Sequence, residues 1–582
     1  MKYAILIMYK CKESENMGKT KRKLRKGIFI KLIIAIVLLA GGLYFYHDLT
    51  TKKQLTPKYL ASSGEKIILY DEEGKNVKEL VRGTKINLYI NQQGEERSKI
   101  KYEDVDYFVM NKNIVDDYKD TVQEKEVYVR TSYNLKKASD SLELMDLVKK
   151  EDKLEIIGFD TLNSDGTVNM YQVKYQDNEG YFYAKYTVSD LEKAKENYDY
   201  NGAYEFHKKQ KNTYGGGDGA SLDYFPVVKP KFENNVMPKN VYSLYLNGTK
   251  ATMAMVDDYI EFAKTTKINA FVIDIVDDVN IGYASPYMKE KSPTSYKNAQ
   301  NSVEDYQKAV QKLKDNGFYV IGRITAFKDT YYVNDHKENA ITNSSGNPLK
   351  HQSSYWPSAF NRDVWQYDVE LAMEAVNLMG FNEIQFDYVR FPDGLGTMEK
   401  NKTVNYHNTY NETKAQAIQR FLMYATNELH KLNVYVSADV FGESSYGSGY
   451  ITSYGQYWPA ISTVVDVISA MPYTDHFGKN YGGHAEPWIY PYDTISFWAK
   501  TAKKEQDMTA NPAVARTWIT AYNTPVAASG TKLAYNGKEV SAQIKALYDN
   551  GLDGGYMTWN AYSYLNNLKK YKNQKDAYMK EY

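Results

Sequence analysis

The hydrophobic pattern changes character several times along the chain. Residues 28–46 form an apolar run that only Lys31 interrupts. Short runs of alternating apolar and polar residues follow from about residue 62 to 190, and Gly and Asn turns separate them, which is typical of antiparallel strands. Apolar periodicity stops from 191 to 238, and strand-like and helix-like patterns alternate from 239 onward. This succession predicts a multidomain protein.

The apolar segment 28–47 predicts a transmembrane helix, because its length is close to the ~20 residues that a bilayer core requires. A basic stub at 1–27, with Lys19, Arg22 and Arg25 among its charges, precedes it. The positive-inside rule keeps such a cluster in the cytoplasm. We therefore expect a single-pass cell-membrane protein, bound to the membrane through this helix, with a cytoplasmic N-terminus and extracellular C-terminal domains. A cleaved signal peptide is the alternative.

Two small all-β barrels are predicted after this segment, at 62–118 and 124–190. Strand-like runs that carry this prediction lie at 66–70, 85–90, 127–130, 154–159, 170–175 and 180–186. In the second barrel, the order "VRTSYNL", "KLEIIGF" and then a "YQVKY…GYFYAKY" hairpin resembles bacterial Src-homology-3-like modules. The resemblance implies attachment to a cell wall or substrate, and a spacer without a ligand is the alternative. Residues 191–238, rich in Lys, Gly and Pro, predict a linker.

The last 340 residues alternate strands with helices. Eight strand-like runs lie at 241–246, 270–275, 319–326, 383–388, 434–440, 467–471, 517–520 and 555–559. Helical spacing of apolar residues separates several of them, with Ser302 and Asn411 as expected N-caps and Gly317 and Gly380 as expected stops. Eight such repeats within 239–568 predict a (β/α)8 TIM barrel. A doubly wound open sheet is the alternative, although no Gly-rich phosphate loop follows the first strand.

Three long loops are expected at the carboxyl ends of the barrel strands, where such barrels carry their working site. They span about 277–301, 328–362 and 392–410. The first two are rich in aromatic residues, namely Tyr283, Tyr287, Tyr296, Tyr331, Tyr332, Tyr355 and Trp356. These loops predict a walled cleft in which aromatic rings stack on sugar faces.

Carboxylates at the predicted strand ends are the main chemical signal. Asp387 ends the fourth strand and Asp439 the fifth, and Glu443 follows shortly after Asp439. Neighbouring strands lie about 4.8 Å apart, so these groups can form the carboxylate pair that glycoside hydrolysis needs. Arg390 is expected to hold Asp387 ionised, and a purely structural Asp–Arg bridge is the alternative. Asp274 ends the second strand in the same way.

Composition excludes several other kinds of site. Lys and Arg number 73 and Asp and Glu 72, so the net charge of +1 gives no whole-chain basic bias toward nucleic acid. The single cysteine, Cys11, excludes a disulfide scaffold and a cysteine-based zinc site. His476 and His484 lack helical ligand spacing, and residues 274–278 have no EF-hand pattern. We therefore expect no metal and no cofactor.

Five strings, in order, resemble the bacterial putative glycosyl hydrolase domain family. They are "FVIDIVDD", "GRITAFKD", "EIQFDYVRFPDG", "VSADVFGE" and "MPYTDHFG", and the resemblance covers about 239–566. It implies a relative of the α-amylase-type TIM barrels, in which the strand-four Asp, here Asp387, is the nucleophile. Those enzymes use a strand-five Glu as acid, so Asp439 and Glu443 both stay open. The chain departs from the family pattern at Val276, Ala470 and Thr520, which leaves room for a weakened or altered catalyst.

The prediction that follows is a glycoside hydrolase acting on an extracellular or cell-wall polysaccharide through paired carboxylates. Catalysis is assigned to Asp387 with Asp439 or Glu443. Substrate contacts are assigned to Asp274, Arg323, Asp329, Tyr388, Arg390, Tyr473, His476, Trp518, Trp559 and Asn560. The alternative is a non-catalytic glycan-binding surface protein that keeps the barrel.

Overall fold

The computed structural model describes residues 19–52, 55–202, 222–223, 225–445, 453–560 and 564–582. Cys11, most of the predicted basic stub and residues 203–221 of the predicted linker lie outside the described residues. The chain divides into two compact units, one of residues 1–125 and 156–171, the other of residues 126–155 and 172–582.

A long helix, α2 (Lys19–Lys52), stands where the membrane anchor was predicted. In the described part of the chain, however, no helix is both long enough and apolar enough to cross a membrane. The first residues of α2 are basic and the charged Lys31 interrupts its apolar part, so the helix has no unbroken apolar run of the ~20 residues that a span requires. The predicted transmembrane helix is therefore wrong, and so are the single-pass location and the membrane contact inferred from it.

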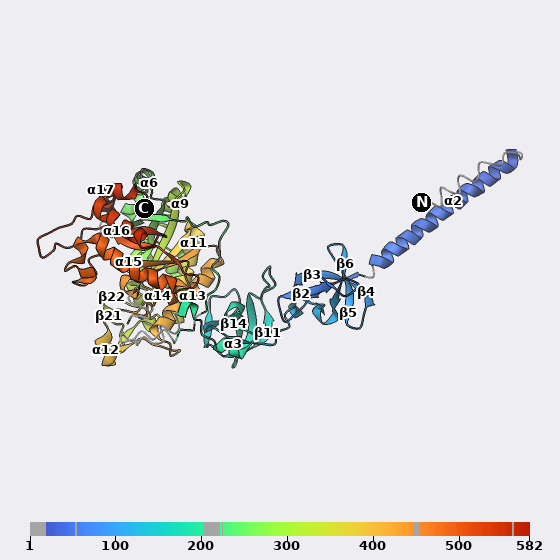
Figure 1. The fold of residues 1–582 in the computed structure, drawn as a ribbon, viewed down its shortest axis with the longest axis horizontal. Coiled ribbons are helices and arrows are strands. Elements are labelled where there is room, and N and C mark those ends of the chain that lie inside the picture. The colour runs from blue at the N-terminus through green and yellow to red at the C-terminus, as the bar shows by residue number, and fades with distance from the viewer. Residues whose placement is uncertain (1–18, 53–54, 203–221, 224, 446–452, 561–563) are drawn as a thin grey trace. The chain divides into compact units, whose positions relative to one another are not determined.

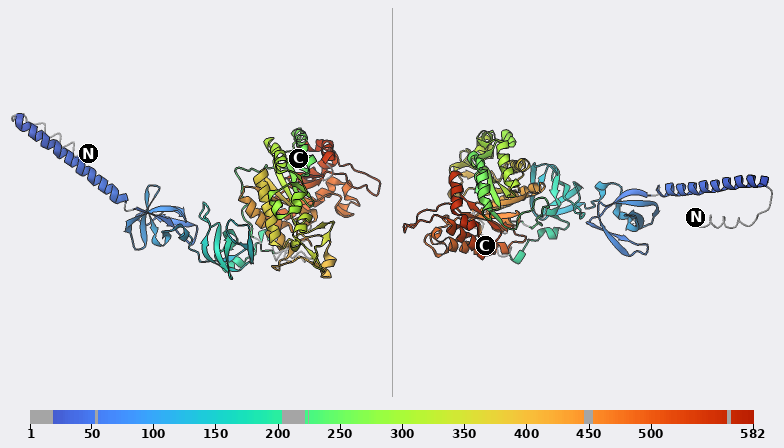
Figure 2. Two further views of the ribbon diagram at one scale, coloured as in Figure 1. Left: turned by 180° about the vertical axis from the view of Figure 1, so that it is seen from behind. Right: turned by 90° about the horizontal axis from the view of Figure 1, so that it is seen from above.

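The first β-region is a seven-stranded sheet with the order β3-β2-β6-β5-β4-β1-β7 (blue in Figure 2). Its strands are β1 (Leu55–Leu60), β2 (Lys66–Tyr70), β3 (Asn76–Val81), β4 (Lys85–Gln93), β5 (Arg97–Tyr102), β6 (Val105–Met110) and β7 (Ile114–Val115). Alternate residues such as Ile67, Leu69, Ile86 and Leu88 enclose a common core, as the period of two predicts.

The second β-region is also seven-stranded, with the order β10-β9-β13-β12-β11-β8-β14. Its strands are β8 (Glu126–Val129), β9 (Tyr133–Lys136), β10 (Leu144–Val148), β11 (Lys153–Phe159), β12 (Met170–Tyr175), β13 (Asn178–Tyr183) and β14 (Thr187–Val188). A short helix, α3 (Leu191–Lys195), follows, with Asp190 as its N-cap. The strand-like runs expected in both regions are therefore strands, except that β13 ends at Tyr183, where a 3-10 turn (Ala184–Tyr186) follows, and β8 ends at Val129.

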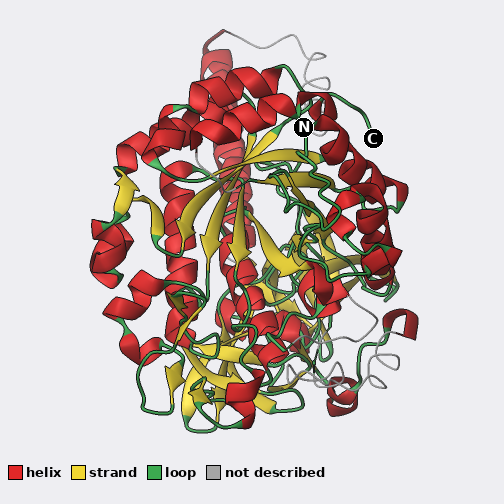
Figure 3. Ribbon diagram, turned by 90° about the vertical axis from the view of Figure 1, so that its left-hand side faces the viewer, coloured by secondary structure: helices red, strands yellow, loops and turns green. Residues whose placement is uncertain are grey.

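The C-terminal region is a nearly closed parallel barrel (Figure 3). Its strands follow the order β27-β26-β25-β23-β19-β16-β15-β29-β28. They are β15 (Val241–Leu246), β16 (Ala270–Asp277), β19 (Tyr319–Thr325), β23 (Glu383–Asp387), β25 (Tyr435–Phe441), β26 (Val467–Met471), β27 (Val514–Ala515), β28 (Thr517–Thr520) and β29 (Gly555–Trp559). The chain on either side of Arg516 pairs with β26 through β27 and with β29 through β28. This segment brings the two ends of the sheet together, so the doubly wound alternative does not apply.

Helices surround the barrel strands (Figure 1). They are α5 (Lys250–Ala254), α6 (Val256–Lys264), α7 (Pro286–Lys291), α8 (Pro293–Lys297), α9 (Val303–Asp315), α10 (Thr330–Asp335), α11 (Arg362–Met379), α12 (Gly396–Lys400), α13 (Lys414–His430), α14 (Trp458–Ser462), α15 (Pro491–Asp507), α16 (Gly537–Asp549), α17 (Tyr564–Asn573) and α18 (Lys575–Tyr578). Ser302 caps α9, and Gly380 ends α11 in the left-handed conformation, as expected. The N-cap of α13 is Thr413 rather than the expected Asn411, because Thr413 and Gln416 form a capping box.

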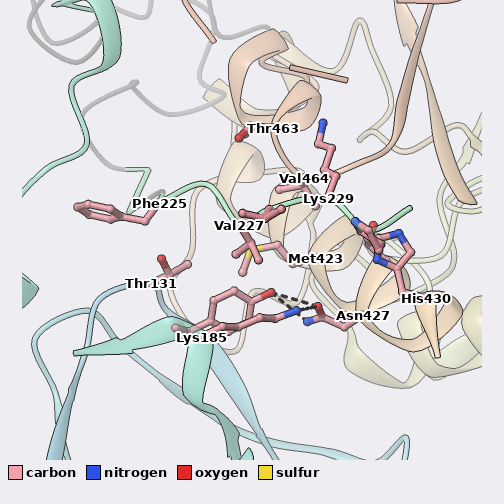
Figure 4. Close-up of a pocket in the computed structure, with 14 residues that line it drawn as sticks. Thr131, Lys185, Phe225, Val227, Lys229, Met423, Asn427, His430, Thr463 and Val464 are labelled. Carbon is pink, nitrogen blue, oxygen red and sulfur yellow. Dashed lines mark hydrogen bonds between the residues drawn. The ribbon is translucent and has the colours of Figure 1, made fainter. Parts of the chain in front are cut away.

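Helix α13 is buried along nearly its whole length. Strands β8, β9, β10, β13 and β14 of the second sheet belong to the same compact unit as the barrel, and the ends of β9 and β13 contact this helix. The Lys136 ammonium forms a fully buried ion pair of 2.6 Å with Glu428, and the Tyr183 hydroxyl donates to the same carboxylate. Lys185 donates to Asn427 nearby (Figure 4). An amphipathic helix normally keeps one face in water, so the burial of both faces of α13 shows that the sheet covers the face that the barrel leaves open.

Candidate active site

Arg323 stands at the centre of a carboxylate cluster inside the barrel. It lies on β19, and the inward-facing ends of the neighbouring strands surround its guanidinium. Its Nη1 lies 2.6 Å from Asp274 and 3.5 Å from Asp277, its Nη2 lies 2.5 Å from Asp387, and its Nε lies 3.7 Å from Asp439. One buried positive charge thus faces four carboxyl groups, which together exceed it in formal charge.

Asp387 and Asp439 sit side by side within this cluster. Strands β23 and β25 pair in parallel with Phe386 opposite Ala438, so the next residues, Asp387 and Asp439, occupy neighbouring positions. Because both carboxylates contact the same guanidinium, their nearest oxygens lie within about 9 Å of each other. This upper limit allows both of the separations found in glycosidase carboxylate pairs, about 5–5.5 Å and about 6.5–9.5 Å.

The two carboxyl groups have different environments. The Asp387 carboxylate accepts hydrogen bonds from Arg323 and, at 2.6 Å, from the backbone N–H of Tyr388, and both donors stabilise its ionised form. The Asp439 carboxyl accepts 2.8 Å from the Trp518 indole N–H, while its Oδ2 has no hydrogen-bond partner among the described residues. Burial and the nearby Asp387 charge raise the pKa of Asp439 well above its usual value. The pair therefore combines a stabilised carboxylate with a group that tends to keep its proton.

Asp274 lies deeper on the opposite side of Arg323. Burial raises the pKa of Asp274 to about 7, although Arg323 opposes this shift. The Tyr245 hydroxyl donates to the Asp274 carboxyl, and the Tyr306 hydroxyl donates 2.8 Å to its backbone carbonyl. Asp274 is therefore held by Tyr245, Tyr306 and Arg323.

Aromatic rings form one wall of the cluster. Trp559 lies 5.2 Å from the Arg323 guanidinium and 4.5 Å from the Tyr245 ring, and it stacks on Tyr473 at 6.3 Å. Trp518 meets Trp559 edge to face. Trp559 is only partly buried, whereas Tyr473 and Trp518 are buried. Trp559 is therefore the ring of this wall that offers surface to a ligand.

Several predicted site residues lie outside the direct contacts of Arg323. Arg390 does not pair with Asp387: it forms an ion pair of 3.0 Å with Asp393, and it lies over the rings of Trp356 and Phe441. The guanidinium that holds Asp387 is Arg323, which the inward alternation of β19 brings to the same level.

Asp329 is the buried N-cap of α10, where it accepts 2.8 Å from the Tyr332 N–H. The Tyr388 backbone is in the left-handed region, and its ring lies 4.6 Å from the Lys328 ammonium. His476 is exposed and contacts the Tyr473 ring, and Asn560 is buried after β29. These residues lie around the cluster rather than in it.

Glu443 belongs to a 3-10 turn, η7 (Gly442–Ser445), just beyond β25. It is exposed and accepts a hydrogen bond from the Tyr454 hydroxyl. Its position at the mouth of the barrel is compatible with substrate contact. Among the described residues, the carboxylates that form ion pairs with Arg323 are Asp274, Asp277, Asp387 and Asp439, so Glu443 is separate from the Asp387–Asp439 pair.

The aromatic residues of the long loops only partly line open space. Tyr283, Tyr332 and Trp356 are buried. Tyr332 packs at 4.2 Å on Tyr367 of α11, and Tyr283 packs at 5.1 Å on Tyr306 of α9. Tyr283 and Tyr332 therefore anchor their loops to helices, and these three of the seven predicted rings are not exposed for stacking on a sugar.

Two members of the site were not assigned from the sequence. Asp277 lies at the end of β16, and its side chain is 29% exposed, against 8% for Asp387 and 1% for Asp439. Tyr245 lies next to the last residue of β15, and its hydroxyl donates a hydrogen bond to the Asp274 carboxyl. Asp277 belongs to the acidic run 274–278, which is visible in the sequence. Alternation alone does not place it beside Asp274, because the register of β16 against β19 shifts between Asp274 and Val276.

Within the described residues, no group of three or more His, Cys, Asp or Glu side chains is arranged to hold a metal ion.

Comparison with solved structures returns small overall similarity scores. A hypothetical protein from Ruminiclostridium thermocellum is 34% identical over 34% of this chain and 97% of its own, with a TM-score of 0.29. The glycoside hydrolase domain of PgaB (BpsB) from Bordetella bronchiseptica is 12% identical over 59% of this chain and 99% of its own, with a TM-score of 0.40. The spore cortex-lytic enzyme SleL from Bacillus cereus is 10% identical over 58% of this chain and 75% of its own, with a TM-score of 0.33. No curated protein matches the chain.

The family described as "Putative glycosyl hydrolase domain" matches residues 243–564, which is more than half of the chain and contains all the barrel strands after the first two residues of β15. The match does not extend to the two small sheets, and their resemblance to Src-homology-3-like modules is not confirmed. Together with the carboxylate cluster, the match assigns the barrel to glycoside hydrolysis as a class of activity. The chain belongs to this glycosyl hydrolase domain family.

Proposed function

We propose that the barrel hydrolyses glycosidic bonds of a polysaccharide with Asp387 and Asp439 as its catalytic pair. The observation that carries the proposal is that these two carboxyl groups lie at neighbouring positions on adjacent strands and share the Arg323 guanidinium. Hydrolysis requires one ionised carboxylate and one carboxylic acid. The different environments of Asp387 and Asp439 support the assignment of one group to each of these roles.

Asp387 serves as the ionised member. Hydrogen bonds from Arg323 and from the Tyr388 N–H keep its charge and fix its orientation at the mouth of the barrel. From there the carboxylate attacks, or stabilises, the sugar carbon that becomes positively charged as the glycosidic bond breaks.

Asp439 serves as the acid. The raised pKa of Asp439 keeps a proton available for the glycosidic oxygen, and the Trp518 indole N–H holds the other carboxyl oxygen in place. After proton transfer, the negative charge on Asp439 is stabilised by the nearby Nε of Arg323.

Trp559 and Asp277 complete the site on the side that faces solvent. The partly exposed Trp559 ring offers a surface for an apolar sugar face, and the more exposed Asp277 carboxylate accepts hydrogen bonds from sugar hydroxyls. These contacts orient the sugar above the catalytic pair.

The test is reducing-sugar release from a panel of glycans by the wild-type protein and by Asp387→Asn. We expect the variant to lose about 10²–10⁴ of the rate, because the substitution removes a charged catalytic group while keeping the shape of the side chain. Circular dichroism of both proteins checks that the barrel is folded. Glycan binding without release by either protein identifies a non-catalytic glycan-binding protein, and equal release by both contradicts the assignment of Asp387.

A further inference from the structure

One buried side chain joins the ends of the two strands that carry the proposed catalytic pair. Gln456 lies in the segment 453–456, just before α14, and is fully buried. Its Nε2 donates 3.1 Å to the backbone carbonyl of Asp439 and 3.3 Å to that of Val389, and its Oε1 accepts 2.8 Å from the backbone N–H of Phe441. Through this one amide, the chain that follows β23 is connected to the end of β25.

The amide lies where direct pairing of the two strands stops. Strands β23 and β25 pair in parallel up to Phe386 and Ala438, one residue before the proposed catalytic pair. In a parallel sheet, a residue donates to a carbonyl of the neighbouring strand and accepts from the N–H two residues further along that strand. The side chain of Gln456 repeats this pattern on Asp439 and Phe441. It therefore continues the hydrogen bonding of the sheet beyond the last strand pair, at the level of the two carboxyl groups.

The partners of the amide fix its orientation. A backbone N–H only donates and a carbonyl only accepts, so the amide oxygen faces Phe441 and the amide nitrogen faces Asp439 and Val389. A carboxylate at this position would repel the two carbonyls, and an apolar side chain would remove a partner from all three buried backbone groups, which is destabilising. The position therefore requires a group that both donates and accepts.

The same segment supports the turn that orients Asp387. Tyr388 has a φ of 52°, in the left-handed region that residues other than glycine rarely adopt, and its N–H donates 2.6 Å to the Asp387 carboxylate. Such a backbone conformation persists only where the surrounding structure fixes it. Just after this turn, the buried amide binds the Val389 carbonyl, and the Tyr454 carbonyl accepts 2.9 Å from the Phe391 N–H. These two bonds hold the turn that aims the carboxylate.

We propose that Gln456 is a positioning residue of the barrel, which sets the separation and orientation of the Asp387 and Asp439 carboxyl groups by joining the two strand ends. The inference rests on the proposed function, because that separation matters for the reaction only if these two groups are the catalytic pair. Gln456 is fully buried and bonds to backbone groups, so it acts through them and does not touch the substrate. In an active site, a displacement of about 1 Å can lower the rate about 10²-fold.

Gln456→Met tests this role, because methionine keeps the length of the side chain and removes the three bonds to the backbone. Gln543→Met is the matched control. Gln543 is also fully buried, and its side chain accepts 2.9 Å from the Thr520 N–H and donates to the carbonyls of Thr520 and Glu539 at 2.9 and 3.3 Å. The control therefore loses the same kinds of bond at a strand end that carries neither carboxyl group.

Steady-state kinetics on a glycan that the wild-type protein cleaves gives the first readout. We expect kcat to fall about 10–100-fold in Gln456→Met while KM stays within about twofold, because the catalytic geometry changes and the sugar contacts do not. In Gln543→Met, kcat should stay within about threefold of the wild-type value. Rates are compared below the unfolding transition of each variant, so that a loss of stability shared by both does not enter.

Amide hydrogen exchange of the full chain gives a second readout, which does not depend on turnover. The Phe441 N–H donates to Gln456, so it loses its acceptor in Gln456→Met. We expect this N–H to exchange at least about tenfold faster in Gln456→Met and at the wild-type rate in Gln543→Met.

The two readouts separate failure of this inference from failure of the proposed function. If kcat is the same in Gln456→Met and Gln543→Met, or if only KM rises in Gln456→Met, the positioning role is wrong, while loss of activity in Asp387→Asn still supports the catalytic pair. Unchanged exchange of the Phe441 N–H in Gln456→Met contradicts the joining of the strand ends. A wild-type protein that releases no sugar, or an Asp387→Asn variant that releases as much as the wild type, contradicts the proposed catalytic pair, and exchange alone then decides whether Gln456 joins the two strands.

Discussion

The barrel buries an arginine near each end, and the two arginines have opposite surroundings. At the amino end, Arg516 binds both oxygens of Glu383 at 2.8 and 2.9 Å, and both side chains are fully buried. The Tyr319 hydroxyl adds a donor to the same carboxylate. At the carboxyl end, Arg323 faces four carboxyl groups, one of which is 29% exposed. The first arrangement is balanced and closed, and the second carries excess negative charge and opens to solvent.

The two arginines show two uses of a buried charge: Arg516 forms a structural ion pair, and Arg323 lies in a cluster of carboxyl groups, two of which have raised pKa values. In the balanced pair, one guanidinium and one carboxylate compensate each other's charge, and no further carboxylate competes for the Arg516 guanidinium among its ion pairs in the described residues. Burial raises the pKa of Asp439 and that of Asp274, and the neighbouring carboxylates Asp387 and Asp277, respectively, raise them further. A catalytic site needs this second situation, because its groups must exchange protons.

The largest expected effect is a loss of kcat when the proposed acid, Asp439, is replaced. Asp439→Asn removes the proton donor, so kcat should fall about 10²–10⁴-fold on a glycan that the wild-type protein cleaves. In the wild type, activity should decline as pH rises through the raised pKa of Asp439, because the acid form is lost. This alkaline limb should be missing from the residual activity of Asp439→Asn.

The matched variant for this test is Glu443→Gln, which changes the other candidate acid. If Glu443→Gln shows the loss and the flattened pH profile while Asp439→Asn is active, the acid is Glu443 and the assignment to the Arg323 cluster is wrong.

The next effect concerns stability at the amino end. Glu383→Gln leaves the Arg516 charge buried without its counter-ion, which should lower the free energy of unfolding by about 3–5 kcal/mol. Urea denaturation of the purified protein measures the change. Activity per folded molecule should stay at the wild-type level below the transition.

The double variant Glu383→Met/Arg516→Met serves as the control, because replacing a whole buried pair by apolar groups is often neutral or stabilising. It should regain most of the loss. A large drop in kcat in the folded Glu383→Gln protein would show that the amino-end pair also acts in catalysis.

A smaller effect is expected at the exposed carboxylate. Asp277→Asn keeps the shape of the side chain but weakens hydrogen bonds to sugar hydroxyls, so KM should rise about tenfold with little change in kcat. Steady-state kinetics on the preferred glycan measures both constants. Asp393→Asn is the control, since Asp393 pairs with Arg390 outside the cluster. Unchanged KM in Asp277→Asn would exclude Asp277 from substrate binding.

The smallest effect concerns a carboxylate outside both clusters. Burial raises the pKa of Asp329 from 3.8 to about 7. The folded state therefore keeps a proton on Asp329 that the unfolded chain releases. The contribution of this proton to the free energy of unfolding is complete below about pH 4 and is lost as pH rises through about 7. Asn keeps the N-cap of α10 without an ionisable group. The melting temperature of Asp329→Asn should fall less than that of the wild type between pH 5 and pH 8.

Asp329→Ala separates the charge from the cap. It should be destabilised by about 1 kcal/mol at both pH values, because it loses the hydrogen bond to the Tyr332 N–H. Sugar release should be unchanged in Asp329→Asn, and a loss of activity would return Asp329 to the substrate site where the sequence placed it.

Local patterns predicted much of the barrel because strands and helices depend on neighbouring residues. The alternation in 383–388 gave β23 and turned Asp387 inward beside Gln385, and Gly380 ended α11. The membrane anchor was wrong, since an apolar run by itself does not establish a span. Proximity in sequence predicts Arg390 as the partner of Asp387, whereas the partner in the structure, Arg323, comes from the adjacent strand β19.

The sequence by itself determined the order of strands and helices, the family and the carboxylates at the strand ends, because these depend on residue type and spacing. Only the tertiary structure decided which charges meet. Barrel closure places Asp274, Asp387 and Asp439, from three strands, around the guanidinium of Arg323, which lies on a fourth. It also decided the use of many tyrosines: Tyr245, Tyr306 and Tyr319 are buried, and their hydroxyls bind carboxyl or carbonyl oxygens inside the barrel. Such long-range pairings depend on register and closure, which no local pattern encodes.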